Sequence, residues 1–228
     1  MFPGRPGDAP YEADAPTGPT NLYGQTKLDG EHAVLQEYKA AGRAGLGVVL
    51  RVPVLYGDAE MPSESAVNVL MDVLWKAQEG EKVKMEHWAL RYPTNTEDIG
   101  RVCHGKLCQS ADTWPRYMAT IASADHGVDL ATKYLAASDS ERASMPQVLQ
   151  FSSEDKYTKY EICQLFGEIM GLSIDNIEPN TQGNDPNSSV QRPYDCHLST
   201  KALKDLGIDV STQDFTGWWR REVRAFRK

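Results

Sequence analysis

Hydrophobic and polar positions follow a helical spacing in the first clearly patterned segment, residues 21–41. The residues that recur there at steps of three and four are Tyr23, Lys27, Gly30, Val34, Tyr38 and Ala41. This spacing predicts one long helix with these residues on a shared face. The next segment, 47–52, is a nearly continuous aliphatic run. Such a run predicts a buried strand of a parallel sheet, because helices cover both faces of such sheets.

Capping residues and terminating glycines predict the other elements. Two helices are expected from Ser63 or Ser65 to about Glu79 and from Thr94 or Thr96 to about Cys108. A third is expected over 159–170, capped by Thr158 and ended by Gly171. The last two begin at Thr200, running through "KALKDLG", and at Thr212, running to the C-terminus. Short strands are expected at 82–85, 90–93 and 147–151. The alternation of strands and helices predicts an α/β fold with a parallel sheet. Residues 110–147 have no clean period and are predicted to be an insertion.

The charge balance argues against two classes of partner. The chain carries 32 acidic and 24 basic residues, a net charge of -8, whereas nucleic acids and anionic membranes require a basic surface. No run reaches the about 18 apolar residues of a membrane-spanning helix. The first residues, "MFPGRPGDAPYEADAP", show no basic segment followed by an apolar one, as a signal peptide would. The sequence therefore predicts a cytoplasmic protein that binds neither nucleic acid nor membrane.

The cysteines and histidines predict no metal site. The four cysteines form no C-x-x-C pair, and none of the five histidines stands at a matching spacing. Free thiols in a reducing compartment are therefore expected.

A Y-x-x-x-K motif formed by Tyr23 and Lys27 is the candidate for chemistry. On a helix these positions share a side, with Cβ atoms about 5–6 Å apart. A neighbouring ammonium stabilises a phenolate, so the tyrosine can exchange a proton with a carbonyl or an alcohol. The alternative is coincidence, since ten tyrosines and twelve lysines in 228 residues produce about half such a match by chance. The helix start after a proline-rich loop, and the buried strand that follows, favour the first interpretation.

These pieces in this order resemble the extended short-chain dehydrogenase/reductase family. Five stretches carry the resemblance to its dTDP-4-dehydrorhamnose reductase branch: "PTNLYGQTKLDGEHAVL", "LRVPVLYGD", "RYPTNTEDIGRVC", "YTKYEICQLFGEIMGL" and "QRPYDCHLSTKALKDLGI". Within that branch, "YGQTKLDGE" and "RVPVLYG" are most similar to the regulatory β subunits of methionine adenosyltransferase.

The resemblance implies roles for individual residues. Tyr23 corresponds to the family's acid/base tyrosine, and Lys27 to the lysine that tunes it and holds the nicotinamide ribose. Pro53 and Leu55 belong to the loop that lies against the nicotinamide, and Arg192 corresponds to a substrate-binding residue at the edge of the substrate lobe. Arg51 is expected instead to form a structural ion pair or to hold a loop.

The resemblance also implies a partial Rossmann-like parallel sheet with a smaller substrate-type lobe. Residues 1–57 and 91–109 are assigned to a remnant of the dinucleotide-binding domain, and residues 58–90 and 148–228 to the smaller lobe. The family's cofactor is NADP or NAD, whose pyrophosphate is held by a glycine-rich turn after a strand. No such turn precedes Tyr23, so the N-terminal half of the Rossmann domain is predicted to be missing and cofactor binding to be weak or absent. The helix face that carries Tyr23 should also lose much of its packing.

Three functional hypotheses follow. The first is a truncated, non-catalytic relative of the methionine adenosyltransferase β subunit, which modulates S-adenosylmethionine synthesis by binding the catalytic subunit. The second is an NAD(P)-dependent nucleotide-sugar reductase or epimerase that uses Tyr23 and Lys27. The third is an unstable fragment without a function of its own. The aromatic and arginine-rich C-terminal segment "DFTGWWRREVRAFRK" is either a helix that covers the core or a binding hot spot for another protein.

Overall fold

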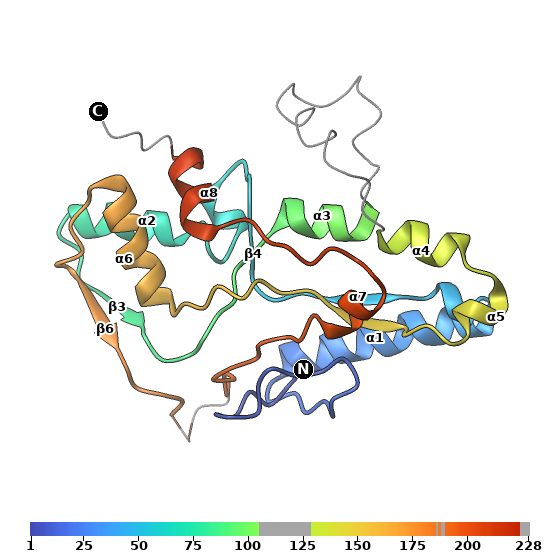
Figure 1. The fold of residues 1–228 in the computed structure, drawn as a ribbon. Helices are drawn as coiled ribbons and strands as arrows, with labels where there is room; N and C mark the ends of the chain where they lie inside the picture. Colours follow the sequence, from blue (N-terminus) through green and yellow to red (C-terminus); the bar gives the residue numbers. More distant parts are fainter. Residues whose placement is uncertain (105–128, 186, 188–189, 224–228) are drawn as a thin grey trace.

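The computed structural model describes residues 1–104, 129–185, 187 and 190–223 (Figure 1). The helices are α1 (Leu22–Ala40), α2 (Leu70–Gln78), α3 (Thr96–His104), α4 (Leu130–Ala136), α5 (Asp139–Arg142), α6 (Lys159–Met170), α7 (Lys201–Asp205) and α8 (Phe215–Glu222), with 3₁₀ turns η1 (Ala44–Leu46) and η2 (Pro62–Glu64). The strands are β1 (Val49–Arg51), β2 (Leu55–Tyr56), β3 (Val83–Glu86), β4 (Thr94–Asn95), β5 (Val148–Gln150) and β6 (Ile177–Asn180). The strands form three parallel pairs, β1 with β5, β2 with β4 and β3 with β6. The protein is thus an α/β protein with short parallel sheets, as predicted.

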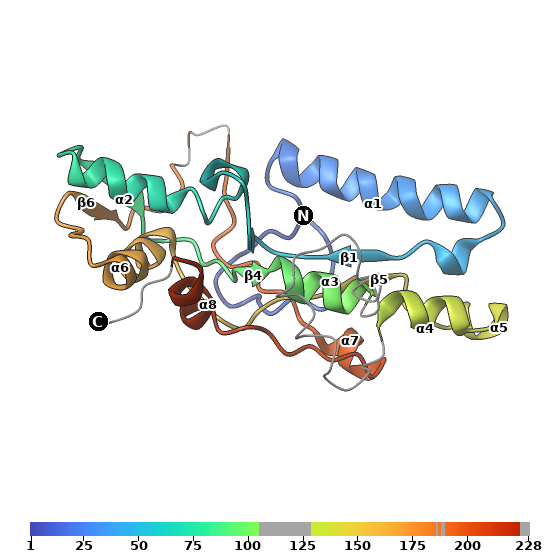
Figure 2. The same ribbon diagram turned by 90° about the horizontal axis from the view of Figure 1, so that it is seen from above.

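The β1–β5 pair is covered by helices on both faces. Figures 1 and 2 show α1 on one face and α3, α4 and α7 on the other. Side chains from the β1–β5 pair and from α3, α4 and α7, with their flanking segments, form one apolar cluster. Its most deeply buried members are Val102, Leu149, Phe151 and Leu203, each with 0% exposure. In β1, Val49 and Leu50 are half-buried and Arg51 is buried. A mostly aliphatic run fits this position, because a strand between two helical layers has little solvated surface.

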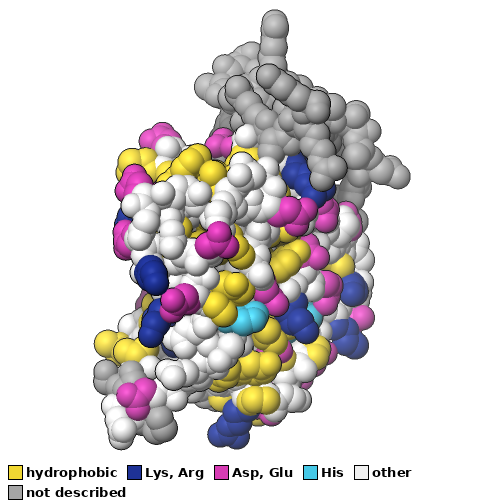
Figure 3. Space-filling model, turned by 90° about the vertical axis from the view of Figure 1, so that its left-hand side faces the viewer, with side chains coloured by type: hydrophobic (Ala, Val, Ile, Leu, Met, Phe, Trp, Pro, Cys, Tyr) yellow, Lys and Arg dark blue, Asp and Glu magenta, His cyan; other side chains and the backbone are white. Residues whose placement is uncertain are grey.

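The β3–β6 pair belongs to a second, larger cluster with α2, α6 and α8. Its core is aromatic: Trp219 contacts the rings of Tyr56, Phe166, Phe215 and Trp218. On the end of the molecule that α2, α6 and the β3–β6 pair occupy, hydrophobic side chains are interspersed with acidic and basic ones (Figure 3). The three aromatic residues of α8 are buried. The structure therefore supports α8 as a helix that covers the core and leaves its aromatic side chains unavailable as a hot spot.

The predicted caps are confirmed where the capping bonds form between residues of the helix end itself. Thr158 and Glu161 form a capping box at the start of α6, and Gly171 ends the helix in the left-handed conformation with φ 69°. The predicted Thr94 or Thr96 cap of α3 is wrong, because the Asn95 side chain accepts the hydrogen bond from the Glu97 N–H at 2.8 Å.

Other predicted boundaries also shift. Asp214, not Thr212, caps α8, and no side-chain cap bond is made by Thr200. The strand expected at 90–93 is wrong, since Arg91 makes only an isolated bridge with Tyr157 and the strand β4 follows at Thr94. Helix α2 begins at Leu70, later than expected, because Ser65 instead bonds the N–H groups of the turn that precedes it.

Helix α1 confirms the predicted 21–41 element. The buried residues are Gly24, Leu28 and Glu31, whereas Tyr23 is 72% exposed. The outward position of the Tyr23 face agrees with the expected loss of packing. Gly24 permits close approach of the N-terminus, since a Cβ there would lie 2.8 Å from the Met1 nitrogen.

The predicted insertion at 110–147 falls partly on residues 105–128, which lie outside the described residues. From residue 129 onward the chain forms α4 and α5, and Leu130 and Tyr134 are buried in the β1–β5 cluster. The division into lobes and insertion stays a prediction. Among the described residues, no helix combines the length and the apolar composition needed to cross a bilayer.

Candidate functional site

Tyr23 and Lys27 lie together at the start of α1. Asn21 caps the helix, its side chain accepting a hydrogen bond from the Gly24 N–H at 2.9 Å, so Tyr23 occupies the first turn. The Lys27 Nζ lies over the Tyr23 ring, 5.3 Å from the centroid, within the range of a cation–π contact. The geometry therefore brings the two residues of the motif together, in an exposed position.

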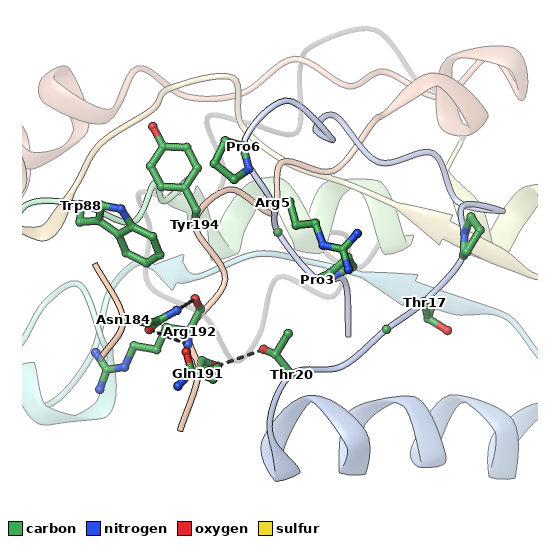
Figure 4. Close-up of a pocket in the computed structure, with 13 residues that line it drawn as sticks. Pro3, Arg5, Pro6, Thr17, Thr20, Trp88, Asn184, Gln191, Arg192 and Tyr194 are labelled. Carbon is green, nitrogen blue, oxygen red and sulfur yellow. Dashed lines mark hydrogen bonds between the residues drawn. The ribbon is translucent and has the colours of Figure 1, made fainter. Parts of the chain in front are cut away.

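A cavity of about 560 Å³ lies beside this helix start, between the N-terminal loop and the segment around residues 184–194. Figure 4 shows it with Trp88 next to Tyr194 on one side and Arg5 reaching in from the N-terminal loop. The residues that line it are Pro3, Gly4, Arg5, Pro6, Pro16, Thr17, Gly18, Thr20, Trp88, Asn184, Gln191, Arg192 and Tyr194. Its size is that of a small-molecule site.

Hydrogen bonds join the cavity wall to the cap of α1. The Thr20 hydroxyl and the Asn21 side-chain amide both donate to the Gln191 carbonyl, each at 3.0 Å. Asn184 and Arg192 exchange two further bonds: the Asn184 side-chain amide donates to the Arg192 carbonyl, and the Arg192 N–H donates back to the Asn184 side-chain oxygen at 2.9 Å. These contacts fix the position of Arg192 relative to the helix that carries Tyr23.

The cavity combines aromatic surface with positive charge. The Trp88 and Tyr194 ring centroids are 5.3 Å apart. Arg5 and Arg192 are exposed, so their guanidinium groups are available to a ligand. The pKa of the Lys159 ammonium is lowered, first by burial and then by repulsion from Arg91 and Arg192. The arrangement suits a ligand with a flat ring and an anionic group.

The structure places only some of the predicted site residues at the cavity. Arg192 lines the cavity, whereas the described lining includes neither Tyr23 nor Lys27, although Thr20 directly precedes their helix. Pro53 lies between β1 and β2, and Leu55 lies in β2 opposite Thr94; neither lines the cavity. Their assigned roles stay predictions.

Sequence reasoning missed most of the cavity wall. Arg5, Trp88 and Tyr194 belong to segments far apart in the chain, and no local spacing signals that they meet. The one usable signal was the arginine of "QRPYD", which singled out Arg192.

Arg51 confirms the structural role expected of it. Its guanidinium donates twice to the Glu31 carboxylate, at 2.8 and 2.9 Å, and once to the Ala13 carbonyl at 3.0 Å. It also lies 5.2 Å from the centroid of the Phe2 ring. Arg51 therefore ties α1, β1 and the N-terminal loop to one another.

No group of potential metal ligands gathers within the described part of the chain, and Cys103, Cys163 and Cys196 are free thiols. The described residues provide only part of a binding site for a nicotinamide dinucleotide. Tyr23 and Lys27 could contact its nicotinamide half, but α1 begins behind a proline-containing loop instead of a strand and a glycine-rich turn. The described residues thus do not fit the pyrophosphate.

Comparison with known proteins gives concordant matches. Residues 1–121 match the RmlD substrate binding domain. The methionine adenosyltransferase 2 subunit beta of Danio rerio is 32% identical over 229 residues, which cover 100% of this chain and 58% of that protein. A dTDP-4-dehydrorhamnose reductase structure from Clostridium acetobutylicum superposes with a TM-score of 0.62 at 17% identity, covering 98% of this chain and 61% of the other. The same enzyme from Bacillus anthracis, in complex with NADP, gives a TM-score of 0.60 at 14% identity and covers 99% and 62%.

These matches support different conclusions about the chain. The reductases are distant in sequence and share the fold alone. The subunit beta relatives share sequence along most of this chain, yet the chain spans only about half of their length.

Proposed function

The chain belongs to the RmlD substrate binding domain family, and we propose that it is a non-catalytic, regulatory relative of the methionine adenosyltransferase β subunit. In this role it would bind the methionine adenosyltransferase catalytic subunit and modulate S-adenosylmethionine synthesis. The observation that carries the proposal is the 32% identity to the Danio rerio subunit beta along the whole of this chain.

The geometry around Tyr23 supports a role without catalysis. Tyr23 is 72% exposed, whereas proton transfer to a bound substrate requires a site from which water is excluded. The described residues also do not fit a dinucleotide pyrophosphate, so NADP or NAD binding by residues 1–228 is expected to be weak or absent. A surface that binds another protein needs neither feature.

The test is capture of the catalytic subunit. The full 228-residue chain, immobilised through a tag, is expected to retain purified methionine adenosyltransferase catalytic subunit and to change its KM or kcat for methionine. The Clostridium acetobutylicum reductase is the matched control, because it has the same fold at 17% identity and should retain nothing. Equal retention by both proteins, or by neither, would contradict the proposal.

A second candidate function rests on the cavity. Its paired rings and two arginines suit a nucleotide whose diphosphate is anionic, which would favour an NAD(P)-dependent nucleotide-sugar reductase or epimerase that uses Tyr23 and Lys27. Oxidation of NADPH by the chain alone with a dTDP-4-keto sugar would favour this candidate over the first.

Under this second candidate, Arg192→Gln should weaken the binding of dTDP, measured by isothermal titration calorimetry. A charge-assisted hydrogen bond contributes about 1.5–3 kcal/mol, which corresponds to a roughly 10- to 150-fold rise in Kd. Arg43→Gln is the matched control, because Arg43 is also exposed but lines a different groove. Equal affinity of the wild type and the Arg192 variant would rule out this role for Arg192.

A further inference from the structure

Glu86, the last residue of β3, holds the loop that carries Trp88 to the cavity. One oxygen of its carboxylate accepts hydrogen bonds from the Trp88 N–H at 2.8 Å and the Ala89 N–H at 2.6 Å. The other oxygen accepts from the Arg91 guanidinium at 2.7 Å. Both side chains of this ion pair are partly buried, with 20% of Glu86 and 21% of Arg91 exposed. A single carboxylate therefore fixes the backbone of the loop at its start and binds a side chain at its end.

The loop needs these bonds because it is buried where strand pairing stops. The His87 N–H still donates to the Asn180 carbonyl of β6, whereas Trp88 and Ala89 lie beyond the end of β3. Ala89 is 1% exposed, so solvent is not at hand as a substitute partner for its N–H. A buried N–H without a partner is costly. Without Glu86 the loop would have to rearrange, and Trp88 would move with it.

The loop in turn sets the aromatic wall of the cavity. The Leu90 N–H donates to the Tyr194 carbonyl at 2.7 Å, and Figure 4 shows the Trp88 and Tyr194 rings next to each other, with centroids 5.3 Å apart. The indole also lies against Gly183, where a Cβ would be 3.1 Å from the ring. A shift of the loop would therefore separate the two rings that a flat ligand ring would contact.

We propose that Glu86 is a positioning residue of this cavity: its carboxylate holds Trp88 beside Tyr194, so that the two rings receive the flat ring of a ligand. The proposal rests on the second candidate function, in which the cavity binds a nucleotide. Glu86 does not line the cavity. It acts through the loop bonds, in the way that supporting residues fix the side chains of a binding site.

The negative charge of Glu86 has a separate effect on the same region. Burial and then Arg91 and Arg192 lower the pKa of the Lys159 ammonium, whereas Glu86 opposes them. Loss of the charge should therefore favour an anionic ligand, which is opposite to the effect of displacing Trp88. Glu86→Gln and Glu86→Ala remove the charge equally, but only glutamine keeps an oxygen that can accept from the two loop N–H groups. Comparison of these variants separates position from charge.

The first test is binding of dTDP to the full 228-residue chain, measured by isothermal titration calorimetry. Glu86→Ala should raise Kd by about 5- to 150-fold, the range for loss of one base stacked on an aromatic side chain, whereas Glu86→Gln should stay close to the wild type. Glu64→Ala is the matched control, because exposed Glu64 also accepts a backbone N–H of its own loop, from Glu60 at 3.1 Å, but does not line the cavity. Equal Kd values for Glu86→Ala and the wild type, or equal losses in the two Glu86 variants, would overturn the proposal.

The second test needs no ligand and uses nuclear magnetic resonance. In Glu86→Ala the Trp88 and Ala89 amides should exchange about tenfold faster and the ring contacts between Trp88 and Tyr194 should be lost, while amides of α6 keep their protection. Glu86→Gln should restore both signals. Failure of the wild type to bind dTDP would refute the nucleotide function alone, and the amides and ring contacts would then decide the role of Glu86. Unchanged signals in Glu86→Ala would overturn that role, as would loss of protection throughout the chain, because Glu86 would then support the whole fold instead of the loop.

Discussion

Replacement of Trp219 by alanine should lower the free energy of unfolding by about 3–5 kcal/mol, the cost of deleting a large buried aromatic side chain. Trp219 has 0% exposure and contacts four other aromatic rings, so the surrounding side chains cannot close the space it leaves. Small domains are stable by only about 5–15 kcal/mol. The variant should therefore unfold at a much lower urea concentration, measured by circular dichroism.

Two further variants separate packing from other effects. In the part of the chain that the structure describes, the Trp219 Nε1 has no hydrogen-bond partner, so Trp219→Phe keeps most of the apolar contact and removes an unpaired donor. It should cost clearly less than Trp219→Ala. Trp75→Ala is the control for loss of an indole, because Trp75 is half exposed and its removal should change stability little. Similar losses at Trp75 and Trp219 would show that the aromatic cluster is not a packed core.

Sequence reasoning succeeded where the governing physics is local. The helix α6 is bounded by Thr158 and Gly171, and both residues act through bonds and backbone angles within the helix ends themselves. The cap of α3 could not be assigned in this way. Asn95 is held in β4 by pairing with Tyr56, and only that tertiary contact decides which of three neighbouring polar residues meets the helix.

The same distinction applies to the candidate site. The Tyr23–Lys27 pair follows from a spacing of four on one helix, so it could be predicted. The cavity beside it depends on contacts such as that between Thr20 and the Gln191 carbonyl, which are 171 residues apart. The exposure of the Tyr23 face was expected, whereas the burial of Glu31 against Arg51 could not be read from the spacing.

Breaking the ion pair between Glu31 and Arg51 is the second change with a large expected effect. Both side chains are 8% exposed and their closest atoms are 2.8 Å apart. Glu31→Ala leaves the guanidinium with the Ala13 carbonyl and the Phe2 ring but no counter-charge. Arg51→Ala leaves a buried carboxylate alone. Removal of one partner of a buried pair costs about 3–5 kcal/mol, because the remaining charge stays desolvated and uncompensated.

The double variant Glu31→Leu with Arg51→Met should cost less than either single change, since both charges then leave the interior and apolar side chains of similar size take their place. Lys201→Ala is the control, because the ion pair of Lys201 with Asp205 is exposed and screened by solvent, so no measurable loss is expected. Urea unfolding of the wild type, Glu31→Ala, Arg51→Ala and the double variant Glu31→Ala with Arg51→Ala gives the coupling energy between Glu31 and Arg51. Strictly additive single effects would mean that the pair does not hold α1 to β1. The outward orientation of Tyr23 would then have to depend on Leu28 and on the close contact of Gly24 with the N-terminus.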